Sequence, residues 1–191
     1  MKKNISLCSL LIWMVISVRL SAQSQEEMKA FTDYMTPGPM QQMMAKSAGA
    51  WTGVVTMWTQ AAAQPVTYTM ESDFEMILGG RYLKESDKGT MFNMPFEGVG
   101  TAGYDNARKI FVSSWVDNMG TGIIYLEGTW DAATNSINYS GKSTDAVTRK
   151  DIPTREIYKF VDDNHQLLEM YFTENGKEFK GMEIKYSRKG S

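Results

Sequence analysis

The side chains that could do chemistry in this sequence are few. His165 is the only histidine and Cys8 the only cysteine among the 191 residues. A zinc or haem site would need further His or Cys ligands, and a Ser-His-Asp triad would need its histidine beside a serine, so none of these sites is expected. His165 lies in the polar stretch 163–166 and is interpreted as an exposed turn residue. The sequence predicts neither a metal nor a cofactor.

Polar residues on extended segments are the better candidates. A carboxylate paired with Arg or Tyr in a closed interior could orient the polar head of a ligand or act as a general acid or base. Asp117 is the leading candidate because Trp115 and Asp117 would share a strand face beside the Gly-rich turn 118–122. The alternative is that Asp117 caps this turn and that most of the others are solvated. The polar candidates are Arg81, Tyr104, Asp117, Glu127, Arg155, Glu169 and Tyr171.

The stretch 96–122 shows which kind of element carries these residues. Its pattern predicts a β-hairpin, with Phe111, Ser113, Trp115 and Asp117 on one face and the residues between them on the other. Gly98, Gly100 and Gly103 match the GxGxxG spacing of dinucleotide-binding loops. No helical pattern follows them, so that interpretation fails, and the glycines are instead expected to let a strand bend strongly.

The whole region from residue 51 onward repeats this hairpin design. Segments with one apolar and one polar face alternate with turn signals rich in Gly, Asn and Asp. Met70 and Phe74, Leu168 and Met170, and Ile184 all lie on apolar faces. About ten short strands in series predict an all-β fold, an antiparallel up-and-down β-barrel, because closure removes exposed strand edges. The expected segments are 51–59, 65–76, 79–86, 90–92, 97–104, 109–117, 121–130, 136–143, 153–162, 166–173 and 178–188, with a turn at 87–89.

The region before the barrel divides into three parts. Lys2, Lys3 and the apolar run 5–20 indicate a secretory signal peptide, residues 1–22, cleaved after Ala22. Residues 23–39 are expected to be a flexible lead-in, either a short helix or a loose segment. Residues 40–48 favour a short helix that plugs one end of a single barrel domain over 40–191.

Charge and processing exclude several classes of function. Three of the 20 basic residues fall in the predicted signal peptide, which leaves 17 Lys and Arg against 22 Asp and Glu. Nucleic acid is therefore not an expected partner. The apolar run is too short for stable membrane insertion, and the mature chain would contain no cysteine. We expect a periplasmic or secreted protein that is held together by its core alone.

Several motifs carry a resemblance to known barrels. Gly49-Ala50-Trp51 at the start of the first strand resembles the Gly-X-Trp signature of lipocalins and other calycins, in which a basic side chain from the last strand, here Arg188, covers the tryptophan. The segments 51–53, 78–83, 95–98, 103–105, 115–117 and 183–188 resemble, in order, the bacterial domain of unknown function 1579 family. The resemblance implies a calycin-like barrel and assigns no reaction.

Three hypotheses for function remain open. The first is that the barrel binds a small, largely apolar or amphipathic molecule, because thirteen methionines of the mature chain could line an adaptable interior. Its ligand-binding residues would come from Trp115, Asp117, Arg81, Tyr104, Glu127 and Arg155. The second is an isomerase or hydrolase on the same barrel, using Asp117, Glu127 or Arg155. The third is an interaction module with a packed barrel that forms homo-oligomers.

Overall fold

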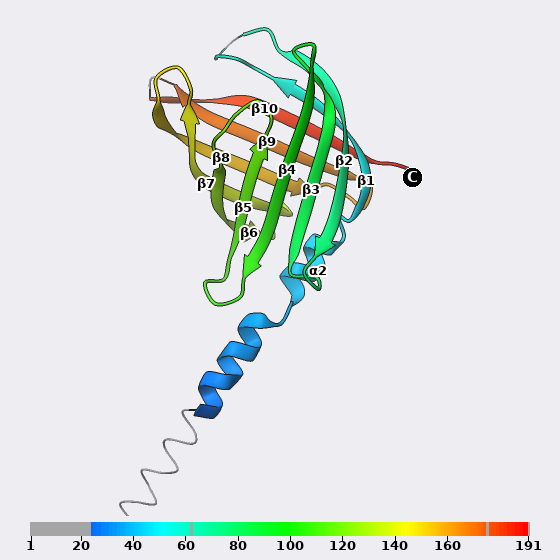
Figure 1. The fold of residues 1–191 in the computed structure, drawn as a ribbon, viewed down its shortest axis with the longest axis vertical. Helices are drawn as coiled ribbons and strands as arrows, with labels where there is room; N and C mark the ends of the chain where they lie inside the picture. The colour runs from blue at the N-terminus through cyan, green and yellow to red at the C-terminus, as the bar shows by residue number, and fades with distance from the viewer. Residues whose placement is uncertain (1–23, 62, 175, 191) are drawn as a thin grey trace, which may run out of the picture. The chain divides into compact units, whose positions relative to one another are not determined.

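The barrel is closed and built from ten antiparallel strands. The structure, a computed structural model, describes residues 24–61, 63–174 and 176–190. The predicted signal peptide, with its cleavage site after Ala22, lies outside these residues. Figure 1 shows the strands following one another around the wall. They are β1 (Gly49–Met57), β2 (Val66–Ile77), β3 (Tyr82–Met91), β4 (Met94–Asp105), β5 (Ile110–Asp117), β6 (Ile124–Asp131), β7 (Ser136–Asp145), β8 (Lys150–Phe160), β9 (His165–Glu174) and β10 (Lys177–Arg188).

Each strand pairs with its neighbours in sequence, and β1 pairs with β10 to close the barrel. The closing register runs from Trp51 opposite Arg188 to Met57 opposite Met182. Closure gives every strand two partners, so the wall has no free edge. The predicted up-and-down barrel of about ten strands is confirmed.

The chain divides into two units, one ending at Thr36 and one beginning at Pro37. In the first unit, residues 24–35 form a helix, which settles the alternative left open for the lead-in. The second unit contains α2 (Pro39–Ala45) and the barrel. Neither helix in the described part of the chain is long and apolar enough to cross a membrane.

Helix α2 lies at the end of the barrel that carries the β2–β3 and β4–β5 connections (Figure 1). Gln41 fixes it there, because its Nε2 donates to the Tyr104 carbonyl oxygen at 3.0 Å and to Asn106 Oδ1 at 3.2 Å. Met44, one turn further on, is 1% exposed and faces the barrel interior. The predicted helical plug is confirmed, although it ends at Ala45 instead of Ala48.

Strand alternation places the core as the sequence predicted. Met70 and Phe74 of β2, Leu168 and Met170 of β9, and Ile184 of β10 are all buried at 8% exposure or less. The polar residues between them are mainly on the outer wall. Alternation therefore predicts the inward face correctly wherever that face is apolar.

Strand β3 differs from the prediction. Residues 87–89 were expected to be a turn between two short segments, but Tyr82–Met91 is one continuous strand. Asp87 stands opposite Ser72 of β2 and opposite Gly98 of β4. Asp, Lys and Gly favour turns locally, but pairing with strands on both sides satisfies the backbone here and overrides that preference. As a result, the side chain of Asp87 points into the barrel.

Two glycines of β4 make room for an aromatic ring inside the barrel. A Cβ atom at Gly98 would lie 2.3 Å from Cζ2 of Trp115, and one at Gly100 would lie 3.1 Å from its Cε3. Trp115 is thus stacked against bare backbone, which larger residues would prevent. This close approach is a structural requirement for glycine at both positions, and the strand bending expected from the sequence stays a prediction.

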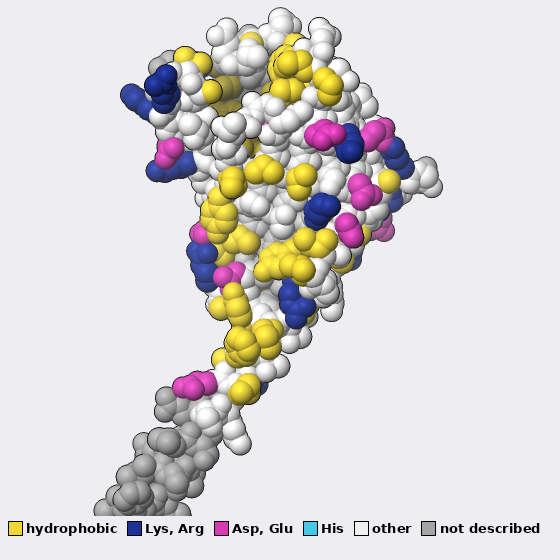
Figure 2. Space-filling model, viewed as in Figure 1, with side chains coloured by type: hydrophobic (Ala, Val, Ile, Leu, Met, Phe, Trp, Pro, Cys, Tyr) yellow, Lys and Arg dark blue, Asp and Glu magenta, His cyan; other side chains and the backbone are white. Residues whose placement is uncertain are grey.

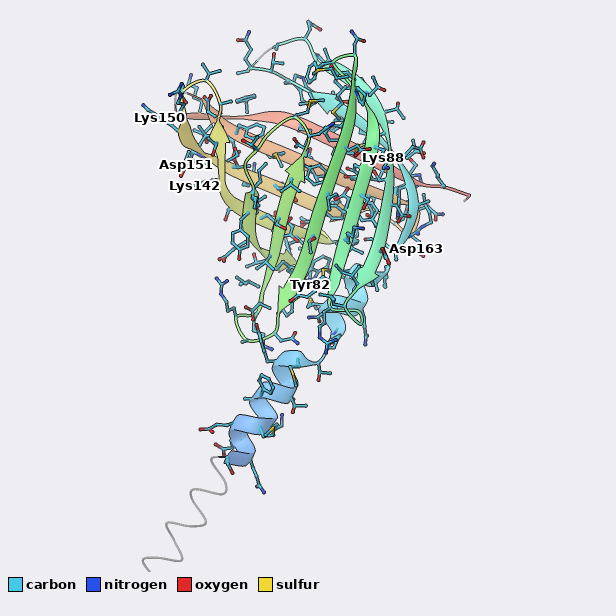
Figure 3. The ribbon with its side chains drawn as sticks, in the orientation of Figure 1. Tyr82, Lys88, Lys142, Lys150, Asp151 and Asp163 are labelled. Carbon is cyan, nitrogen blue, oxygen red and sulfur yellow. The ribbon has the colours of Figure 1, made fainter. Side chains whose placement is uncertain are left out.

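Charged pairs of opposite sign occupy the outer wall. Lys88 of β3 lies 3.7 Å from Glu97 of β4, and Lys142 of β7 lies 3.8 Å from Asp151 of β8. Figure 3 labels Lys88, Lys142 and Asp151, and Figure 2 shows acidic and basic side chains interspersed on the face in view. These pairs are well exposed and contribute little to stability. They give this face no single-sign patch of the kind that binds nucleic acid.

Candidate ligand-binding cavity

A cavity of about 260 Å³ lies inside the barrel. It extends from Met44 of α2 to Phe92 and Met119, which stand in the β3–β4 and β5–β6 connections. Phe92 is 49% exposed and Met119 41% exposed. We call the end marked by these two residues the mouth of the cavity. Hydrophobic side chains gather at the end of the barrel that carries these connections (Figure 2).

The lining of the cavity is mostly apolar. Seven methionines line it together with aromatic and aliphatic side chains. They come from α2, from strands β1, β2, β3, β9 and β10, and from the β5–β6 connection. Methionine is unbranched and polarizable, so such a wall adapts to apolar bodies of varied shape. The sequence left open both a ligand-binding barrel and a packed barrel, and the geometry is that of a hollow barrel.

Four carboxyl groups interrupt this apolar lining: that of Asp117, described below, and those of Glu85, Asp87 and Glu156. Glu85 and Asp87 lie two residues apart on the inward face of β3, and Glu156 lies on β8. Asp87 is 2% exposed and Glu156 7% exposed, whereas Glu85 is partly buried. Oδ1 of Asp87 and Oγ of Ser72, which stand opposite each other in the β2–β3 pair, are buried without a hydrogen-bond partner among the described residues. Glu156 likewise makes no hydrogen bond within the described chain.

Burial shifts the acidity of Glu85, Asp87 and Glu156. Burial raises the pKa of the Glu156 carboxyl to about 7. Burial also raises the pKa of Asp87 to about 6, although the side chains of Ser72 and Glu85 oppose the rise. The pKa of Glu85 is raised by burial first and by the charge of Asp87 second. No Lys, Arg or His is among the described residues that line the cavity, so no protein cation offsets these shifts.

Two tyrosine hydroxyls of the cavity wall make buried hydrogen bonds, one of them to a cavity carboxyl. Tyr186 of β10 donates to Glu85 Oε1 at 2.8 Å. Tyr158 of β8 donates to Gln166 Oε1, and Gln166 Nε2 donates to Ser47 Oγ at 2.9 Å. This second chain connects the cavity wall with the end closed by α2. Buried networks of this kind fix side-chain orientation, so the phenol rings are held in place around the cavity.

Of the residues proposed from the sequence, Trp115 and Asp117 line the cavity. The indole Nε1 of Trp115 donates to Asp117 Oδ2 at 2.8 Å, and Asp117 Oδ1 accepts the backbone N–H of Met119 at 2.9 Å. Asp117 therefore caps the turn, as the alternative interpretation held. Its carboxylate positions the Trp115 ring and the mouth residue Met119.

The other four residues proposed as ligand-binding, Arg81, Tyr104, Glu127 and Arg155, are not among those that line the cavity, and neither are the polar candidates Glu169 and Tyr171. The Arg81 guanidinium donates to the carbonyl of Leu78 at 3.0 Å in the exposed β2–β3 turn. Tyr104 packs edge-on against Phe111, with ring centroids 4.8 Å apart. Glu127 is on the outer wall, where both its oxygens accept from Arg108 at 2.8 Å.

Arg155 is also on the outer wall. It pairs with Glu178 at 2.7 Å, and its guanidinium lies 4.0 Å from the centre of the Tyr171 ring. Glu169 is nearby on β9 and accepts a hydrogen bond from Lys180. These residues form a surface ion-pair group on the outer face of β8, β9 and β10 and are not part of the cavity lining.

Gly49, Trp51 and Arg188 lie at the closed end. Trp51 is fully buried, and the Arg188 guanidinium lies 4.2 Å from the centre of its ring. Arg188 also donates to the carbonyls of Ala48 at 2.8 Å, Lys46 at 2.7 Å and Asp163 at 2.9 Å. Gly49 has φ of 124°, a conformation that brings its backbone close to the guanidinium. The cluster joins the first and last strands to the segment after α2.

His165 begins β9 and lies outside the cavity, with Nδ1 2.9 Å from Asp162 Oδ1. Across the described residues, no three His, Cys, Asp or Glu side chains come together as a metal-ligand set. The cavity carboxyls are therefore not spaced as metal ligands.

The sequence reasoning missed Glu85, Asp87 and Glu156. A signal for the first two was present, because Leu83, Glu85, Asp87 and Met91 follow the alternation of one inward face. Assigning Asp87 to a turn broke that pattern. Glu156 shares its face with Tyr158, which also lines the cavity, and could have been found by the same alternation.

These features define a closed ten-stranded antiparallel barrel with an interior cavity. The crystal structure of Rv2717c from M. tuberculosis has a similar fold, with a TM-score of 0.60 at 15% identity, covering 81% of this chain and 99% of that one. The chain belongs to the family described as Protein of unknown function (DUF1579), whose model matches residues 36–188. No curated protein matches the chain. The calycin label is consistent with the barrel and stays a prediction.

Proposed function

We propose that this protein binds a small, largely apolar molecule inside its barrel. The cavity of about 260 Å³ carries the proposal, because it is lined mainly by Met, aromatic and aliphatic side chains and reaches the half-exposed residues of the mouth. Each methylene group that moves from water to such a lining contributes about 0.8 kcal/mol. At about 30 Å³ per water-sized group, the cavity holds roughly nine non-hydrogen atoms.

The test is native mass spectrometry of the protein purified from its own host. We expect the mass under gentle conditions to exceed the denatured mass by that of a bound molecule, and the difference identifies its class. The same denatured mass tests the proposed export to the periplasm or beyond the cell, because cleavage after Ala22 leaves a chain that begins at Gln23. An intact chain starting at Met1 would contradict export.

A cavity-filling variant separates interior binding from surface adsorption. Ala102 lines the cavity, so Ala102→Phe places a ring in the proposed site. Thr67→Phe adds the same ring at an exposed position of β2. We expect Ala102→Phe to remove the bound mass and Thr67→Phe to retain it. Loss in both variants, or in neither, would contradict binding inside the barrel.

One observation favours an enzyme as a second candidate. Carboxyl groups with pKa values of about 6 and about 7 in a cavity are suited to general acid and base work near neutral pH. The residues first proposed for this role are poorly placed, since Glu127 and Arg155 are on the outer wall and Asp117 caps a turn. A catalytic role would belong to Asp87 and Glu156, and incubating a bound molecule with Glu156→Gln and with unaltered protein would show whether turnover depends on this carboxyl.

A further inference from the structure

The strongest unexplained feature is the acidic part of the cavity wall. Asp87 is only 2% exposed, and its Oδ1 has no hydrogen-bond partner among the described residues. Glu156 is 7% exposed and makes no hydrogen bond within the described chain. Glu85 stands beside Asp87 on β3, accepts a hydrogen bond from the hydroxyl of Tyr186 and interacts with the Asp87 carboxyl. An unpartnered carboxyl in an apolar interior is costly unless a donor or a cation meets it.

The protein itself supplies no such cation to the described lining of the cavity. The groups with titratable side chains that face it are the carboxyls of Glu85 and Asp87 on β3, Asp117 on β5 and Glu156 on β8, and the phenols of Tyr139, Tyr158 and Tyr186 on β7, β8 and β10. All of them are neutral or negative. An anionic ligand such as a fatty acid would meet like charges and no Arg or Lys partner.

A protonated amine fits this wall. Its three N–H donors and positive charge match Asp87 Oδ1 and the Glu156 carboxyl, which have no hydrogen-bond partner among the described residues. Charge-assisted hydrogen bonds of this kind are the strong ones. Tyr139, Tyr158 and Tyr186 also line the cavity, and aromatic rings attract cations at their π faces. The Met and aromatic lining towards the mouth accommodates an apolar body. A metal ion is a poor alternative because these carboxyls do not form a metal-ligand set.

We propose that the cavity takes a small organic cation, a protonated amine on an apolar body of about eight carbon atoms, with its ammonium group at Glu85, Asp87 and Glu156. The inference rests on the proposed binding of an apolar molecule and adds the charge of that molecule. The size follows from room for roughly nine non-hydrogen atoms in about 260 Å³.

The experiment compares three probes of one chain length: octylamine, 1-octanol and octanoate. Titration calorimetry gives their affinities, and the tryptophan emission, to which Trp115 in the cavity wall contributes, gives a second readout. At about pH 8 we expect octylamine to bind at least about tenfold more tightly than octanol, and octanoate to bind most weakly. Octylamine affinity should fall as the pH is lowered to about 5 and the carboxyls become protonated, while octanol affinity should change little.

Variants assign the effect to the wall. Glu156→Gln and Asp87→Asn keep the shape of the side chain and remove its charge, so each should lower octylamine affinity about tenfold and leave octanol affinity unchanged. Glu97→Gln is the matched control, since Glu97 is 67% exposed on the outer wall. If one cavity variant fails to fold, the other still provides the test.

The outcomes separate the two proposals. Octanol binding as tightly as octylamine would overturn the cation inference and leave the apolar-ligand proposal standing. Octylamine binding that is insensitive to both cavity variants would also overturn the cation inference. If none of the three probes binds the protein, both proposals fail.

Discussion

Replacing Glu156 by Gln should stabilise the barrel relative to the unaltered protein, and this gain in the free energy of unfolding should grow as the pH rises. Burial raises the pKa of this carboxyl from 4.5 to about 7 in the folded state. Between these two values the folded state keeps a proton that the unfolded state releases, so the free energy of unfolding falls as the pH rises through this window. Below it both states are protonated, and above it both are ionised and the loss is complete.

The structure sets the size of the effect. A difference of about 2.5 pKa units at 1.36 kcal/mol per unit gives about 3 kcal/mol of stability lost between about pH 4 and about pH 8. Gln cannot ionise, so Glu156→Gln removes this loss. It also removes a negative charge that raises the pKa of Glu85, which acts in the same direction.

Urea denaturation across that pH range measures the effect, with Glu97→Gln as a control that should follow the unaltered protein. The advantage of Glu156→Gln over the unaltered protein should grow by about 3 kcal/mol from the acid to the alkaline end. If the two stability curves instead run parallel from acid to alkaline pH, Glu156 is not held in a water-poor interior and the reasoning on the cavity wall is wrong.

Two further substitutions test the packing that shapes the barrel. Arg188→Ala removes hydrogen bonds to three backbone carbonyls and the guanidinium that covers Trp51. Thermal or urea unfolding should therefore show a loss of about 2 kcal/mol in the free energy of unfolding. Lys185 is 70% exposed on the same strand, so Lys185→Ala should change the stability little. Gly98→Ala places a Cβ atom 2.3 Å from the Trp115 ring, so we expect the free energy of unfolding to fall by about 1–3 kcal/mol and the tryptophan emission to change. A Cβ atom at Gly120 would have its nearest neighbour at 3.9 Å, so the control Gly120→Ala should show neither effect.

The sequence predicted the fold well because most inward faces are apolar. Met70 and Phe74, or Leu168 and Met170, alternate with polar residues, and a shift of one residue would expose all of them, so the register is strongly specified. The Gly-X-Trp triplet and Arg188 likewise mark both ends of the barrel sheet. Closure then follows from the number of strands and the absence of long helical patterns.

The cavity wall was harder to predict because its key residues break the rule that inward residues are apolar. Asp87 followed by Lys and Gly has the local chemistry of a turn, and only pairing with β2 and β4 makes it part of a strand. Glu156 is 69 positions further along the chain, and its electrostatic contact with Glu85 exists only once the barrel has closed. Local patterns carry no signal for a contact of that kind.

The same carboxyls support the proposal that the cavity is a binding site and not a packing defect. Apolar side chains at these inward positions would fit the alternation of their strands and would avoid a cost of several kcal/mol at neutral pH. A defect would leave apolar space, whereas here unpartnered oxygens of Asp87 and Glu156 come from opposite parts of the wall, β3 and β8, to one interior. Polar residues at several inward positions of one cavity, in a barrel whose other inward positions are mostly apolar, are typical of functional positions.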